Sequence, residues 1–345
     1  MKNRFGRTIT LAVILGLTLG ILSSQALAQY TLTKLTSNTS STKYTDGFLV
    51  NAWGLVYAPG GPFWVSDEGS GWSTLYDGTG KPQSLQVIVP QANGSGFGTP
   101  TGIAYNGSTQ FQIDTWPSEF IYATLDGSIQ GWSHFEPSTT LVAVDNSKSN
   151  ASYTGIAVTQ HSSGNYLYAA DFNNNKVDVY DGNFKFVTSF TDPQVPKGFA
   201  AFNVQDIDGE LFVAFAATDG GPGGYVDIYS EAWTLKKRLI KGYPLNQPWG
   251  FAKAPKTGFG PLSGALLVGN DNNTSKINGF SPTTGAYIGT ITNASGKAIE
   301  ISQLWGIDFG GGSSSNGGKN FLYFTAGPDN SAQGLFGVIK YKATK

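Results

Sequence analysis

Acidic and amide side chains recur in this sequence directly after short apolar runs, and tryptophans recur directly before glycines. The acids and amides are Asp67, Glu68, Asp126, Asp171, Asp219, Asn270, Asp271 and Asp329. The tryptophans are Trp53, Trp249 and Trp305. Oxygen donors without cysteine or clustered histidine suit a hard cation such as calcium, or the hydroxyl groups of a sugar. Aromatic rings beside them would supply an apolar surface for a ligand.

The same residues have a structural interpretation, which stays open at this point. A tryptophan at the start of a repeated unit can fill the gap between neighbouring units, where burial of its ring stabilises the fold. An aspartate or asparagine after a strand often closes a hairpin turn with its own side chain. The sequence therefore predicts either a polar, tryptophan-lined binding surface or a set of packing and turn residues.

No complete catalytic group is evident in the sequence. There are two histidines, His134 and His161, and no cysteine. The chain contains no Gly-x-Ser-x-Gly nucleophile motif and no phosphate-binding loop. A binding protein is therefore favoured over an enzyme.

A short phrase that recurs roughly every fifty residues shows which elements must position these side chains. It is clearest as Asn51-Ala-Trp-Gly-Leu-Val and Pro248-Trp-Gly-Phe-Ala. Each copy opens a unit of four short, alternating strands; in the first unit these are 54–58, 63–67, 73–76 and 84–89. The equivalent positions of the six copies are Gly54, Gly102, Gly155, Val204, Gly250 and Gly306.

Six such units predict an all-β fold, a six-bladed β-propeller of four-stranded antiparallel blades. The last unit supplies only three strands, 305–309, 321–325 and 335–341. The segment 30–36 has strand character and no partner nearby in sequence, so we expect it to complete the last blade and close the ring. Two Gly/Ser-rich loops, 91–100 and 310–320, are either surface connections or binding loops.

The first 28 residues have the layout of a secretory signal peptide: Lys2, Arg4 and Arg7, an apolar run, and Ala26-Leu-Ala28 before Gln29. We therefore expect a signal peptide at 1–28 and a single propeller domain at 29–345. The protein would be secreted or periplasmic, without a transmembrane segment in the mature chain, and a monomer. Its net charge of −1 argues against nucleic acid as a partner.

Phrases from end to end of the chain resemble a known family. Ala170-Asp-Phe-Asn-Asn-Asn-Lys-Val-Asp-Val-Tyr180 resembles the turn of NHL repeats. Pro62-Phe-Trp-Val-Ser-Asp67, Phe199-Ala-Ala-Phe-Asn-Val-Gln205 and Leu266-Leu-Val-Gly-Asn270 are similar to phrases of TIGR03118, an exported bacterial family of conserved hypothetical proteins. The resemblance implies a six-bladed propeller of the NHL or TolB-like kind, and it implies no catalytic residues.

Three functions are compatible with these features. The first is a binding module that captures a glycan, a peptide or a protein on the acidic, tryptophan-lined face. The second is a calcium-dependent hydrolase resembling gluconolactonases and arylesterases, and it rests on fold analogy alone. The third is a structural scaffold of the envelope or matrix. The candidate calcium ligands of the second function are Asp67, Asp171, Asn270 and Asp271.

Overall fold

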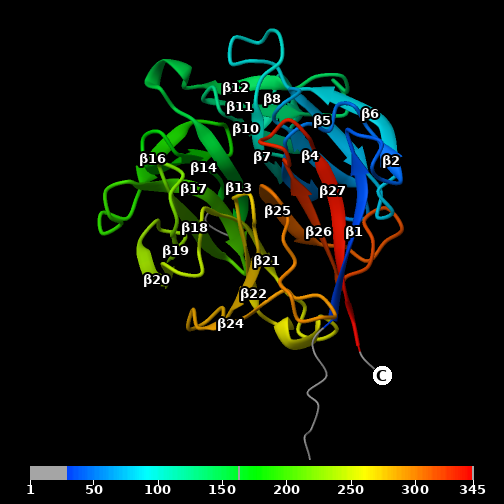
Figure 1. Ribbon diagram of the computed structural model, residues 1–345. Helices are drawn as coiled ribbons and strands as arrows, with labels where there is room; N and C mark the ends of the chain where they lie inside the picture. The colour runs from blue at the N-terminus through cyan, green and yellow to red at the C-terminus, as the bar shows by residue number, and fades with distance from the viewer. Residues whose placement is uncertain (1–28, 162–163, 344–345) are drawn as a thin grey trace, which may run out of the picture.

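The structure is a computed structural model, and it describes residues 29–161 and 164–343. Six antiparallel sheets are arranged around a central axis (Figure 1), as the sequence predicts. In each sheet one edge strand lies innermost, and the polypeptide then moves outward strand by strand before it crosses to the next blade. The predicted signal peptide falls outside the described residues.

The first three blades follow one another along the chain, each from its inner strand to its outer strand. Blade 1 contains β3 (Ala52–Tyr57), β4 (Phe63–Asp67), β5 (Trp72–Tyr76) and β6 (Pro82–Ile88). Blade 2 contains β7 (Pro100–Tyr105), β10 (Phe120–Thr124), β11 (Ser128–Trp132) and β12 (Leu141–Asp145). Blade 3 contains β13 (Tyr153–His161), β14 (Gly164–Asp171), β15 (Lys176–Asp181) and β16 (Phe186–Phe190).

The remaining three blades continue in the same direction around the axis. Blade 4 contains β17 (Phe199–Ile207), β18 (Glu210–Ala217), β19 (Tyr225–Tyr229) and β20 (Leu235–Lys241). Blade 5 contains β21 (Pro248–Lys253), β22 (Leu266–Asn270), β23 (Ile277–Phe280) and β24 (Tyr287–Thr290). Blade 6 contains β25 (Leu304–Phe309), β26 (Phe321–Ala326), β27 (Leu335–Lys342) and β1 (Gln29–Ser37).

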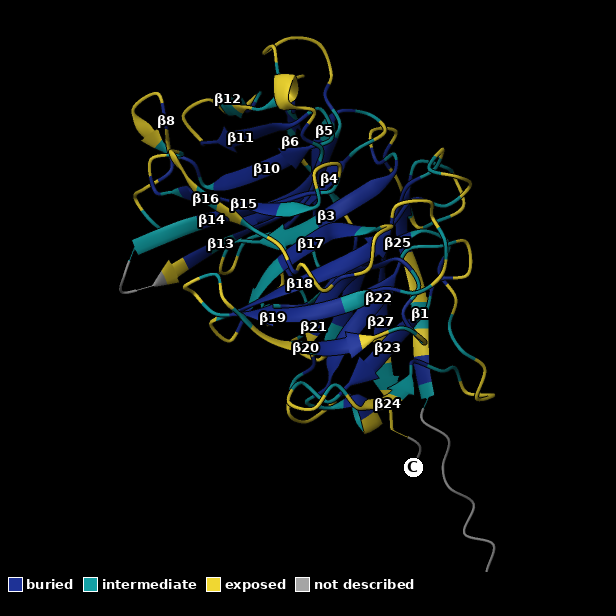
Figure 2. Ribbon diagram, turned by 90° about the vertical axis from the view of Figure 1, so that its left-hand side faces the viewer, coloured by how far each residue is buried: buried dark blue, intermediate teal, exposed yellow. Residues whose placement is uncertain are grey.

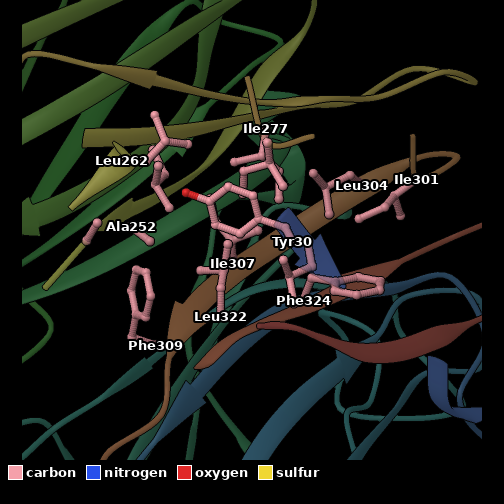
Figure 3. Close-up of a cluster of buried hydrophobic side chains, with 14 of the residues drawn as sticks. Tyr30, Ala252, Leu262, Ile277, Ile301, Leu304, Ile307, Phe309, Leu322 and Phe324 are labelled. Atoms are coloured by element: carbon pink, nitrogen blue, oxygen red, sulfur yellow. The ribbon is translucent and has the colours of Figure 1, made fainter. Parts of the chain in front are cut away.

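The N-terminal strand β1 closes the ring by pairing antiparallel with β27 along its whole length, from Gln29 beside Lys342 to Ser37 beside Leu335. This confirms the predicted closure, and the two strands run side by side in Figure 1. Tyr30 anchors the strand: its ring is buried, and its hydroxyl donates a 2.8 Å hydrogen bond to the carbonyl oxygen of Phe259. Figure 3 shows Tyr30 among the apolar side chains of blades 5 and 6.

The hydrophobic core lies between the blades. Apolar clusters join the facing sheets of neighbouring blades, such as blades 5 and 6 around Ile277 and Leu322. Blades 3 and 4 meet in the same way around Val179 and Phe215. Inner strands are mostly buried, whereas outer strands are largely partly buried or exposed (Figure 2). Each blade therefore depends on its two neighbours for the burial of its apolar surface.

The recurring glycine reflects how closely the inner strands approach one another around the axis. A Cβ atom at Gly54 would collide with the backbone of Thr101 in blade 2, and one at Gly250 would collide with the carbonyl oxygen of Trp305 in blade 6. A side chain at these positions would push neighbouring blades apart. Glycine is therefore required by close contact here, since neither residue has a positive φ angle.

In blade 4 the glycine is replaced by Asn203, which corrects the predicted equivalence at Val204. Each of the inner strands β13 and β17 has a bulge near its start. In β13 the bulge ends at Gly155, and in β17 it ends at Asn203, so these two residues occupy equivalent positions. The Asn203 side chain donates a 2.8 Å hydrogen bond to the carbonyl oxygen of Trp249 in blade 5. It thus links blade 4 to blade 5, as the hydroxyl groups of Thr101, Thr154 and Thr325 link other neighbouring blades by hydrogen bonds to backbone carbonyl oxygens.

A few short elements lie outside the blade pattern. The strand β2 (Tyr44–Thr45) extends blade 6 beside β1, and β8 (Gln112–Ile113) pairs with β9 (Trp116–Pro117). Two short 3₁₀ helices occur in loops, η1 (Ser147–Ser149) and η2 (Gly260–Leu262). Among the described residues no helix has the length and apolar character needed to cross a bilayer.

Candidate functional site

The two ends of the central channel differ in chemistry. We call the face at which the six inner strands begin the N-face, and the face at which they end the C-face. The N-face carries the loops that lead into each inner strand and the turns between the second and third strands of each blade. All the sequence-predicted site residues lie on or next to the N-face.

An aromatic plug, formed by Trp53, Phe202, Trp249 and Trp305, fills the channel at the N-face. Trp53 packs edge-on against Trp305 with ring centroids 4.0 Å apart, and it lies parallel to Trp249 at 6.2 Å. Each of the three tryptophans is only 5% exposed. The plug therefore has the geometry of the packing interpretation, and little of its indole surface is open to a ligand.

Hydrogen bonds hold two of the plug's indole rings across blade boundaries. Trp249 of blade 5 donates from Nε1 to the carbonyl oxygen of Thr154 in blade 3, at 2.9 Å, and so spans the channel past blade 4. Trp305 donates from Nε1 to Oδ1 of Asn51, at 3.1 Å. The Nε1 atom of Trp53 is buried and has no partner among the described residues. The plug thus links blades to one another across the channel.

Most of the predicted acidic and amide residues are engaged in the turns of their own blades. Asn270 accepts a 3.0 Å hydrogen bond from the backbone of Asn246. Glu68 accepts a 2.6 Å hydrogen bond from the Asn51 side chain. Four further aspartates also accept hydrogen bonds, from donors that lie near them in sequence or in an adjacent loop. They are Asp126, Asp171, Asp219 and Asp329.

Asp67 and Asp271 differ from these residues because each has one buried carboxylate oxygen without a partner among the described residues. The other oxygen of Asp67 accepts a 2.7 Å hydrogen bond from Thr74. Burial raises the pKa of Asp67 well above its usual range, against the opposing hydrogen bond. Burial also raises the pKa of Asp271 to about 7. Loss of hydration disfavours the charged carboxylate at both positions.

The four candidate calcium ligands are not brought together. Asp67 lies in blade 1, Asp171 in blade 3, and Asn270 and Asp271 in blade 5, each held by different neighbours. Within residues 29–161 and 164–343, no three His, Cys, Asp or Glu side chains are grouped so as to hold a metal ion. A calcium site needs six to eight converging oxygen ligands. Among the described residues, the four candidates therefore do not form a group of carboxylates for a calcium ion.

An exposed aromatic strip on the N-face was missed by the sequence reasoning. It consists of Phe48, Trp72 and Phe97 on the rim of blade 1, with ring centroids 4.6 Å apart for Phe48 and Trp72 and 5.9 Å apart for Trp72 and Phe97. Phe48 is 38% exposed and Phe97 is 54% exposed. The three rings come from three separate loops or strand ends, so no local periodicity marks them.

The loop that carries Phe97 is held in place by backbone contacts. Gly98 donates a 2.7 Å hydrogen bond to Val89, and Ala92 donates a 2.7 Å hydrogen bond to the Asp126 carboxylate. This loop is the Gly/Ser-rich segment 91–100, for which the sequence left two interpretations open. Asp126, a predicted ligand-binding residue, contributes by fixing the loop.

A cavity of about 370 Å³ occupies the channel between the plug and the C-face. The inner strands of all six blades line it, and Trp249 contributes to its inner end. Tyr57, Tyr105, Asp206 and Asp308, near the ends of their strands, also line it. These four side chains are partly exposed, whereas the lining glycines near the plug are buried. The cavity therefore opens at the C-face.

The chain is similar to proteins whose names state no activity. No protein-family model matches the chain. Uncharacterized protein R648 of Acanthamoeba polyphaga mimivirus is 28% identical, over 91% of this chain and 81% of that protein. Uncharacterized protein L690 of the same virus is 27% identical, over 91% of this chain and 87% of that protein. These similarities extend over nearly the whole propeller.

Comparison with solved structures bears on the fold. A streptogramin B lyase superposes with a TM-score of 0.54 at 13% sequence identity, covering 92% of this chain and all of the lyase. Virginiamycin B lyase from Staphylococcus aureus gives a TM-score of 0.52 at 11% identity, again over 92% of this chain and all of that protein. At such identities the likeness establishes the propeller fold alone.

Proposed function

We propose that the protein is an exported binding module that captures a glycan on its N-face. The observation that carries the proposal is the aromatic strip, because two of its three rings are more than a third exposed and all three are adjacent. Exposed aromatic rings in a row are costly to leave in water and are enriched at recognition surfaces. The apolar C–H face of a sugar ring stacks well on such a surface.

Polar groups beside the strip complement the hydroxyl groups of a sugar. Glu68 is partly exposed, and only one of its carboxylate oxygens accepts the hydrogen bond from Asn51. The Ser70 hydroxyl donates to the carbonyl oxygen of Phe48 at 2.6 Å, which fixes the backbone that bears the first ring. A prearranged surface of this kind loses little conformational entropy on binding.

Export rests on the leader-like residues 1–28, and the resemblance to the exported bacterial family supports the same compartment. N-terminal sequencing of the protein recovered from outside the cytoplasm should begin at Gln29. An uncleaved N-terminus in that fraction would contradict this part of the proposal. The structures of the lyases add no activity to it, since their similarity to this chain is limited to the fold.

The binding proposal is tested by affinity electrophoresis of the mature protein through gels that contain soluble polysaccharides of different backbone. Wild type should be retarded by at least one polysaccharide. The Phe97→Ala variant should lose about tenfold in affinity, equivalent to about 1.4 kcal/mol, while its thermal unfolding temperature is unchanged. Trp116→Ala removes another exposed aromatic ring, 43% exposed against 54% for Phe97, from the C-face side of blade 2 and is the control.

Two results would overturn the glycan proposal. If Trp116→Ala abolished the retardation and Phe97→Ala did not, the binding site would not be the aromatic strip. No retardation by any polysaccharide would remove the glycan and leave the scaffold function as the better account of the protein.

A further inference from the structure

The channel cavity has a composition that the proposed function does not use. Its lining includes four titratable side chains, and all of them are acids: Asp206, Asp308, Tyr57 and Tyr105. No lysine, arginine or histidine is among the described residues that line it. The plug separates this cavity from the aromatic strip on the N-face. A ligand that enters here would come from the C-face.

Asp308 provides an uncompensated negative charge in the wall of this cavity. One of its carboxylate oxygens accepts a 2.7 Å hydrogen bond from the backbone of Phe309. Within the described part of the chain, no cationic side chain forms an ion pair with it. The nearby phenol of Tyr57 is an acid as well. A carboxylate that is partly removed from water and lacks a counter-charge favours a cationic ligand.

The remaining walls suit an organic cation better than a metal ion. Apolar side chains such as Ile103, Ile156 and Ile307 line part of the cavity beside its polar groups, and Tyr57 and Tyr105 lie near the mouth. A divalent metal ion requires several oxygen ligands, and no such group is present in the described residues. An ammonium group with alkyl substituents instead needs one carboxylate, aromatic faces and apolar walls.

The backbone adds further acceptors. Each inner strand is the last strand of its sheet on the channel side, so one of its edges has no neighbouring strand. Edge strands present carbonyl oxygens that are free to accept hydrogen bonds. The volume of about 370 Å³ lies within the range of small-molecule sites.

We propose that the channel cavity binds a small organic ammonium ion, with Asp308 as the counter-charge and the tyrosines near the C-face as its aromatic rim. Burial raises the pKa of Asp308 to about 7, and burial together with the Asp308 charge raises the pKa of Tyr57 to about 12. Tyr57 from β3 interacts with Asp308, and the other titratable side chains that line the cavity are Asp206 from β17 and Tyr105 from β7. Lys253, on the neighbouring strand β21, forms an ion pair with Asp208.

The pH dependence of binding follows from these groups. Binding requires the ionised form of Asp308, because only the carboxylate attracts the cation. Affinity is therefore present above about pH 7 and is lost as the pH falls below it. Tyr57 remains protonated throughout this range, since burial raises its pKa to about 12.

The experiment is calorimetric titration of the full chain with choline, whose quaternary ammonium group does not titrate. Choline should bind at about pH 8.5 and at least tenfold more weakly at about pH 5.5. Its neutral carbon isostere, in which carbon replaces nitrogen, should bind at least tenfold more weakly at the higher pH. Asp308→Asn should weaken choline binding by tenfold or more. Asp329→Asn, which alters an exposed acid on the N-face, should leave it unchanged.

The proposal is overturned if choline does not bind, or if the neutral isostere binds as well as choline. Equal affinity of Asp308→Asn and wild type would equally reject it. Circular dichroism verifies that the variant is folded. If it is not, the pH series and the isostere comparison on the wild-type protein still decide the question.

Discussion

The indole nitrogen of Trp305 donates a hydrogen bond to the side-chain oxygen of Asn51, and so joins the last blade to the first at the centre of the plug. Asn51 also has a positive φ angle of 46°, which asparagine tolerates better than most residues. Its amide nitrogen donates to Glu68. One residue thus combines a backbone requirement with two polar links.

Replacement of Asn51 should therefore destabilise the propeller. We expect Asn51→Ala to lower the free energy of unfolding by about 2–3 kcal/mol, since it leaves the buried indole N–H unpaired and strains the backbone. Asn51→Gly removes the same hydrogen bonds but accepts the positive φ angle, so its loss should be smaller. Urea denaturation measures the free energy of unfolding of both variants. Equal losses of stability would show that the positive φ angle contributes nothing to the effect of Asn51→Ala.

A second prediction concerns the contact between Gly155 and Asn203. A Cβ atom at Gly155 would overlap the Asn203 side chain, so Gly155→Ala should cost about 1–3 kcal/mol of stability. Asn203→Gly alone should cost about 1 kcal/mol, because it removes the hydrogen bond to Trp249. The double variant should be more stable than the sum of the two losses predicts.

The control for this cycle is Gly47→Ala, since a Cβ at Gly47 would meet no atom within 4 Å. Its stability should stay within about 0.5 kcal/mol of wild type. Strict additivity of the Gly155 and Asn203 substitutions would show that their side chains do not compete for space.

A third prediction follows from the raised pKa of Asp271, about 7 in the folded protein against an ordinary value of 3.8. Because the folded state binds the proton more tightly than the unfolded state, stability falls as the pH rises from about 4 to about 7. Asp271→Asn should therefore raise the unfolding temperature clearly at about pH 8.5 and little at about pH 4.

Thermal unfolding monitored by circular dichroism at the two pH values tests this prediction. The matched control is Asp219→Asn, which alters an exposed acid on the N-face of blade 4 and should give no pH-dependent gain. An Asp271→Asn gain of the same size at both pH values would show that burial of the charge is not its origin.

A fourth prediction tests ring closure through Tyr30. Tyr30→Phe removes the hydrogen bond to Phe259 and should cost about 1 kcal/mol. Tyr30→Ala also removes a buried ring from between blades 5 and 6 and should cost about 3–5 kcal/mol. Thr31→Ala, which alters an exposed residue of the same strand, should have little effect on urea denaturation. A small effect of Tyr30→Ala would contradict the anchoring role of β1.

Much of the fold was predictable because its regularities are local. Apolar alternation and glycine-rich turns place the strands of blade 1, and Phe63–Asp67 has the predicted bounds. The missing fourth strand of the last blade indicates β1 as its partner. Blade 4 was placed one residue off because Asn203 replaces the glycine that marks this position in the other blades. The register there depends on a bulge, which the sequence pattern does not mark.

The site was less predictable because it depends on contacts between blades. The position of Asp126 at the end of a strand can be read from the sequence, but its bond to Ala92 comes from a loop of the preceding blade. The aromatic strip unites Phe48, Trp72 and Phe97 from different turns, and no spacing rule connects them. The burial of the plug likewise follows from the narrowness of the channel, which only the assembled ring defines.

The pairing of β1 with β27 has a consequence for biosynthesis. The segment that leaves the ribosome early must wait, with one edge unsatisfied, until nearly the whole polypeptide has been made. Intermediate blades can form as they emerge, but the circle remains a curved, open stack whose two exposed ends invite association with other molecules. Any chaperone that accompanies this protein would therefore have most to protect at the two ends of the unfinished stack.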